Sequence, residues 1–75
     1  MFPIDTATAA AVREVIAKAD RSEAAVARAA RFSPSTWQRR IHARTSFTAA
    51  ELSRIVTALG LTVGELFDTI AEKRR

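Results

Sequence analysis

The chain has 75 residues, which is the size of one small domain. It contains no cysteine, which excludes a disulfide framework and a zinc site built from thiolates. The 12 basic and 8 acidic residues give a formal net charge of +4. No apolar run approaches the roughly 20 residues that a membrane span needs, and the N-terminus lacks the basic start of a signal peptide. We therefore expect a soluble, cytoplasmic, single-domain protein that does not contact membranes.

The charges are distributed unevenly along the chain. Residues 24–50 contain no Asp or Glu but carry five arginines, which are Arg28, Arg31, Arg39, Arg40 and Arg44. A region of one sign on a protein of mixed charge indicates an anionic partner. The alternative is a solvated face that only keeps the protein soluble, and charge alone does not decide between the two.

The hydrophobic pattern predicts five helices and no sheet, because no segment alternates polar and β-branched residues. The predicted helices span about residues 6–19, 23–30, 34–42, 49–59 and 63–72. Their starts are marked by five cap residues, namely Asp5, Ser22, Ser33, Thr48 and Thr62. Glu51 and Glu65 complete two capping boxes, and Gly60 ends the fourth helix. Five short helices with short connections predict a compact all-α bundle.

Each predicted helix has one apolar stripe that we expect to form the core. The stripes are Val12, Val15, Ile16 and Ala19; Val26, Ala27 and Ala30; Trp37 and Ile41; Leu52, Ile55, Val56 and Leu59; and Val63, Leu66, Phe67 and Ile70. Phe32, just before the third helix, forms a hydrophobic staple with Trp37 and so sets the angle at which that helix leaves the turn.

The third predicted helix has a polar face opposite Trp37 and Ile41. The major groove of B-DNA is about 12 Å wide and admits one α-helix, and Gln and Arg can each bridge two atoms of a purine edge. The predicted base contacts are Ser35, Gln38, Arg39 and His42. Hydroxyl groups, arginines and helix N-termini suit phosphate oxygens, and the predicted phosphate contacts are Ser22, Ser33, Thr36, Arg40 and Arg44.

Each of these residues also has a purely structural interpretation. Gln38 and Arg39 could be ordinary surface residues, His42 a residue favoured by the helix dipole, and Ser33 only a cap. Catalysis has little support, because the chain has one histidine, no paired acids and no glycine-rich phosphate loop. We expect no enzyme activity, no metal and no cofactor.

Residues 22–70 resemble the helix-turn-helix domain of the phage repressor and Cro family, also called XRE-like. The resemblance rests on Ala27, on Phe32 and Ser33 at the turn, on the polar residues 34–36 before Trp37, and on the segment FTAAELSRIVTALGLTVGELF. It implies a lambda-repressor-like fold in which the following positions face DNA: Ser33, Ser35, Thr36, Gln38, Arg39 and His42. Four residues depart from the family pattern: Glu23 replaces a common Gln, Arg31 and Ala43 each replace a Gly, and Trp37 replaces an aliphatic residue.

We therefore predict a sequence-specific regulator of transcription, a phage-type repressor or Cro-like protein, that inserts residues 34–42 into the major groove of double-stranded DNA. Two bidentate contacts give roughly 2 to 6 kcal/mol of discrimination, whereas a genome offers about 10⁶ to 10⁹ competing sites. One copy is not selective enough, so we expect a homodimer on an inverted-repeat operator, at least when bound to DNA. Val63, Phe67 and Ile70 are the candidate dimer surface, unless they belong to the monomer core.

Two alternatives stay open. The chain could be a protein-interaction module such as an antitoxin or anti-regulator, whose arginines meet an acidic protein. It could also be the DNA-binding fragment of a longer repressor.

Overall fold

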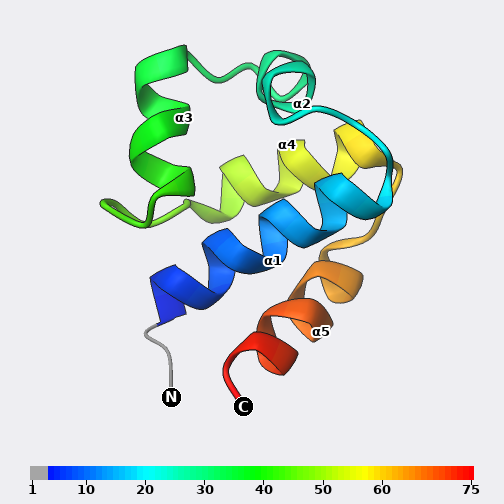
Figure 1. Cartoon of the computed structure of the whole chain (residues 1–75). Coiled ribbons are helices and arrows are strands. Elements are labelled where there is room, and N and C mark those ends of the chain that lie inside the picture. The colour runs from blue at the N-terminus through cyan, green and yellow to red at the C-terminus, as the bar shows by residue number, and fades with distance from the viewer. Residues whose placement is uncertain (1–3) are drawn as a thin grey trace.

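A computed structural model describes residues 4–75. It contains α1 (Ile4–Lys18), α2 (Glu23–Ala29), α3 (Pro34–Ile41), α4 (Ala49–Leu59) and α5 (Val63–Lys73), with no strand among the described residues. The all-α fold with five helices is confirmed, and each helix begins and ends within two residues of the predicted position. Figure 1 shows α2 and α3 at the top and left of the molecule, away from α5 at the lower right.

The helices pack around one core. α1 packs along α5 and also contacts α2 and α3, whereas α4 packs against α2 and α5. The largest fully buried side chains are Ile16, Ile55, Leu66, Val12 and Val26, and they come from four of the five helices. The predicted burial of Ala19 is wrong, because α1 ends at Lys18 and Ala19 lies exposed in the turn that follows.

Local side-chain contacts determine where the helices begin. In each of the two predicted capping boxes, the threonine hydroxyl accepts from the glutamate N–H and the glutamate carboxylate accepts from the threonine N–H. The hydroxyls of Ser22 and Ser33 cap α2 and α3. The prediction that Asp5 caps α1 is wrong, because Asp5 lies inside the first turn and accepts a 2.8 Å hydrogen bond from Ser46.

The first four helices end in the same way, with a residue in the left-handed conformation. These residues are Asp20, Arg31, Ala43 and Gly60, with φ angles of 57°, 64°, 58° and 71°. At the end of α2, Arg31 N–H donates to Arg28 O at 3.0 Å and Phe32 N–H donates to Ala27 O at 2.9 Å. This pair of bonds is the Schellman motif, which usually has glycine at the left-handed position. The turn therefore keeps the conformation that glycine would favour, although the residue is arginine.

Candidate nucleic-acid interface

Three aromatic rings hold α3 at its angle to α2. The ring centroids of Phe32 and Trp37 lie 5.1 Å apart, and Phe47 lies 6.1 Å from each, all with edge-to-face geometry. Such pairs contribute about 0.5–1.5 kcal/mol beyond the burial of their surface. The predicted staple between Phe32 and Trp37 is therefore one side of a triangle whose third member precedes α4.

Arg54 of α4 supports the same turn, although it was not among the residues predicted to matter for the site. Its Nε donates a 2.7 Å hydrogen bond to the carbonyl oxygen of Ala30 at the end of α2. Its guanidinium also lies 5.3 Å from the centre of the Phe32 ring, within the range of a cation–π contact. Arg54 thus satisfies a carbonyl at a helix end and covers the aromatic residue of the turn. The partners lie 24 residues apart in the chain, so local periodicity could not indicate them.

The two faces of α3 are oriented as predicted. Trp37 and Ile41 are only 4% and 2% exposed and belong to the core. Ser35 and Arg39 are exposed on the opposite side, and Gln38 is exposed at its border. The helix therefore presents a polar surface of one serine, one glutamine and one arginine to the outside.

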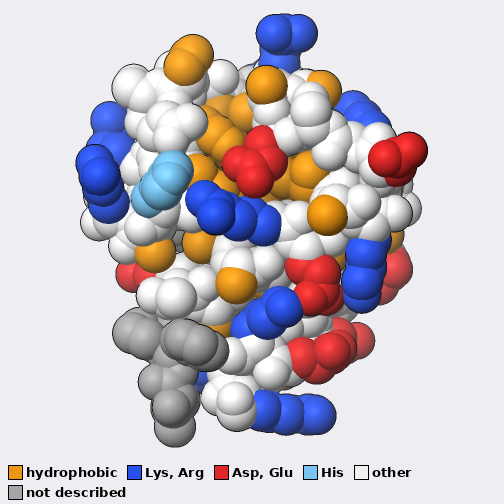
Figure 2. Space-filling model, in the orientation of Figure 1, with side chains coloured by type: hydrophobic (Ala, Val, Ile, Leu, Met, Phe, Trp, Pro, Cys, Tyr) orange, Lys and Arg blue, Asp and Glu red, His pale blue; other side chains and the backbone are white. Residues whose placement is uncertain are grey.

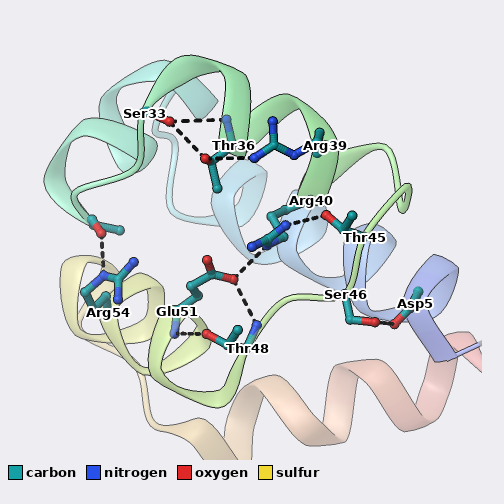
Figure 3. A network of polar contacts seen from close by, with 11 residues as sticks. Asp5, Ser33, Thr36, Arg39, Arg40, Thr45, Ser46, Thr48, Glu51 and Arg54 are labelled. Carbon is teal, nitrogen blue, oxygen red and sulfur yellow. Dashed lines mark hydrogen bonds and ion pairs between the residues drawn. The ribbon is translucent and has the colours of Figure 1, made fainter.

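A chain of hydrogen bonds runs along the outer side of the first turns of α3 (Figure 3). The Ser33 hydroxyl accepts from the N–H of Thr36 at 3.3 Å and donates to Thr36 Oγ1 at 2.9 Å. Thr36 Oγ1 also accepts from Arg39 Nη2 at 3.2 Å. Three of the predicted DNA contacts are thus brought together in one exposed network.

These features agree with a comparison with protein families. The family model of the Cro/C1-type HTH DNA-binding domain matches residues 11–72. The chain belongs to this family. Searches of curated proteins and of solved structures found no match. Membership makes the chain a DNA-binding domain, with α2 and α3 as its helix-turn-helix.

Arg40 of the Cro/C1-type domain is less exposed than the other four arginines of residues 24–50. We predicted it as a phosphate contact, but its Nε donates a 3.0 Å hydrogen bond to Glu51 Oε1, and its Nη1 donates to Thr45. The side chains of Arg40 and Glu51 are only 17% and 11% exposed. Because the guanidinium is occupied by partners inside the protein, we remove Arg40 from the proposed phosphate contacts.

The charge of Glu51 is stabilised by this arrangement. Burial by itself would raise the pKa of the Glu51 carboxyl. Hydrogen bonds from Arg40 and from the Thr48 N–H, together with the positive charges of Arg40 and Arg54, outweigh burial and hold the pKa below its ordinary value. Glu51 therefore caps α4 and anchors the last turn of α3 at the same time.

The remaining predicted contacts surround the polar face of the domain. His42 is the C-cap of α3, and its Nδ1 lies 3.1 Å from the carbonyl oxygen of Gln38. A carbonyl oxygen only accepts, so Nδ1 carries the proton and Nε2 is left for another partner. Arg44 is exposed in the loop after α3, and Ser22 is exposed at the start of α2. The structure thus places all of the predicted residues at the exposed surface except Thr36 and Arg40, which are half-buried.

Acidic groups are separated from this surface or paired. Figure 2 shows basic side chains along the outer edge of α3, whereas acidic side chains lie mainly toward the centre and right of the view. Glu23, at the start of α2, is the exception, and its carboxylate lies 3.9 Å from Arg13 Nε. Away from α3, hydrogen bonds from Lys73 and Lys18 lower the pKa of Glu14. The bond from Lys73 also links α5 to α1.

Residues 4–75 contain no group of three His, Asp or Glu side chains placed to hold a metal ion. None of the helices described in the structure is both long and apolar enough to cross a membrane.

Proposed function

We propose that this Cro/C1-type domain is a sequence-specific regulator that inserts α3 into the major groove of double-stranded DNA. The observation that carries the proposal is the division of α3, whose Trp37 and Ile41 are buried while Gln38 and Arg39 are exposed. A helix that enters the groove needs polar groups for base edges on its outer side, and anchors to the protein on its inner side.

The proposed contacts fall into two groups. Ser35, Gln38, Arg39 and His42 meet base edges. Ser22, Ser33 and Arg44 meet phosphates around them. With Arg40 removed and Arg39 assigned to a base edge, three of the five arginines between residues 24 and 50 remain for the DNA backbone. If each of the three neutralises one phosphate, log K should fall with log salt with a slope of about −2.7 per subunit.

We further propose that the protein acts as a homodimer that represses transcription by covering a promoter in the cytoplasm of a bacterium. Ile70 is buried and Val63 is partly buried against the core, so neither offers much surface to a second copy. Ile4 and Phe67 are 50% and 54% exposed and line one groove together. Of the three candidate dimer residues on α5, only Phe67 is exposed enough to contact a second copy. We add Ile4 of α1 to the proposed dimer surface.

Selection of bound sites from random double-stranded DNA tests this function. The expected result is an enriched inverted repeat whose half-sites lie about 34 Å apart. Enrichment of a single half-site would remove the dimer from the proposal. A protein that retains no DNA at low salt would favour the protein-interaction alternative instead.

A further inference from the structure

Thr36 was expected to contact a phosphate, but its hydrogen bonds point to a different role. Its Oγ1 accepts from the Ser33 hydroxyl at 2.9 Å and from Arg39 Nη2 at 3.2 Å. A hydroxyl oxygen has two lone pairs, so both are occupied, and the O–H proton is left to donate. The Thr36 hydroxyl therefore has only a proton left to offer, and it lies beside a guanidinium, which also only donates.

The same contact determines where the guanidinium lies. Arg39 is in the last turn of α3, yet its Nη2 bonds to a side chain one turn nearer the N-terminus. In a helix-turn-helix, the N-terminal residues of the second helix meet the base edges. Thr36 thus holds the end of the Arg39 side chain over the part of α3 that would enter the groove (Figure 3).

We propose that Thr36 is a positioning and specificity-determining residue, which holds Arg39 so that the two form a donor-only pair selective for guanine. This inference rests on the proposed function. In the major groove, guanine presents two acceptors, O6 and N7, whereas adenine presents the N7 acceptor and the N6 donor. A donor-only pair matches guanine, and adenine would leave one donor facing another. Without the threonine hydroxyl, the long arginine side chain is no longer held in register with both guanine acceptors and can bond to N7 alone, which both purines present.

The test compares Thr36→Val, which keeps the β-branch but loses the hydroxyl, with Thr36→Ser, which keeps the hydroxyl. Affinities are measured for the selected site, for the same site with each guanine replaced by adenine, and for random DNA. We expect Thr36→Val to lower the guanine-to-adenine preference about tenfold and to leave random DNA within about twofold. Thr36→Ser should retain the preference. In an Arg39→Ala background, Thr36→Val should cause little further loss, because the two residues act as one unit.

Three other results would contradict the role of Thr36 or the proposed function. An unchanged guanine preference in Thr36→Val overturns the positioning role while leaving the proposed function intact. Equal losses on the selected site and on random DNA assign Thr36 to a phosphate instead. A wild-type protein without any base preference overturns the proposed function and this inference with it.

A measurement on the free protein separates positioning from folding. The Ser33 hydroxyl still caps α3 in Thr36→Val, because it accepts from the backbone N–H of residue 36. The thermal unfolding midpoint should therefore stay close to wild type. The Arg39 side-chain N–H groups should become more mobile in NMR relaxation with Thr36→Val and not with Thr36→Ser. Unchanged mobility would show that Thr36 does not hold the arginine.

Discussion

Arg40 of α3 and Glu51 of α4 form a nearly buried ion pair, with Nε and Oε1 3.0 Å apart. The same Oε1 accepts from the N–H of Thr48 at 2.9 Å. One carboxylate oxygen therefore joins the end of the recognition helix to the beginning of the next helix. Removing its charge should loosen the placement of α3 without disturbing the rest of the core.

Glu51→Gln is expected to lower the free energy of unfolding by about 1–3 kcal/mol, because the buried guanidinium of Arg40 loses its counter-charge. Urea denaturation measures the change. Glu65→Gln is the matched control, since Glu65 forms the equivalent capping box with Thr62 in an exposed position. It should cost about 0.5 kcal/mol, the contribution of a charge at a helix start. Equal losses in the two variants would mean that Arg40 contributes nothing.

The Glu51 pair also predicts how stability depends on pH. The pKa of Glu51 is lowered from its ordinary value of 4.5 in the folded protein. Near the pKa, the folded state therefore binds fewer protons than the unfolded state. The ion pair stabilises the protein fully when the pH is above the ordinary pKa, and this stabilisation is lost as the pH falls through the lowered pKa. The stability difference between wild type and Glu51→Gln should be constant near neutral pH and should shrink below about pH 4.5. The pKa of Glu14 is also lowered, but Glu14 is present in both wild type and Glu51→Gln, so its contribution cancels in the difference. A difference independent of pH would contradict the pairing.

The left-handed residue after α3 is expected to be a site of strain. Ala43 has a φ of 58°, a conformation that costs a non-glycine residue about 1–2 kcal/mol. Glycine relieves this cost but adds freedom to the unfolded chain, so Ala43→Gly should stabilise by about 0.5–1 kcal/mol. Ala17→Gly, at an exposed position in the last turn of α1, should instead destabilise by about 0.5–1 kcal/mol. Thermal melting distinguishes them, and a loss of stability in both would argue against the left-handed turn.

Glu23 is expected to weaken DNA binding. Its carboxylate stands at the start of α2, next to the proposed phosphate contact Ser22, and Arg13 at 3.9 Å screens it only in part. Glu23→Gln should raise affinity for specific and random DNA alike, by about threefold to tenfold at low salt. Stability should change little, since exposed ion pairs contribute about 0–1 kcal/mol. Glu72→Gln makes the same charge change on α5, and an equal gain there would point to net charge alone.

Phe67 is expected to support the proposed dimer rather than the monomer fold. Because its side chain is 54% exposed, Phe67→Ser should change the melting temperature little. Light scattering after size-exclusion chromatography, with and without the selected DNA, should show the loss of the dimer, whereas Phe67→Leu should keep it. A dimer that survives Phe67→Ser would place the contact surface elsewhere.

Much of the fold could be predicted because it depends on contacts within one helical turn. The capping boxes of Thr48 with Glu51 and of Thr62 with Glu65 join residues three apart, so their spacing is visible in the sequence. The outward face of α3 was predictable for the same reason, since Trp37 and Ile41 are four residues apart and share one side of a helix.

The sequence by itself therefore determined where the helices begin and which side of α3 is polar, whereas only the tertiary structure decided which polar groups remain available. At about 100° per residue, Arg40 lies about 60° from Trp37 around α3, at the border between the buried and exposed sides. Its partner Glu51 is 11 residues away, and Arg54 reaches a carbonyl 24 residues away. Such pairs depend on how α4 packs beside the helix-turn-helix, and no local period encodes that packing.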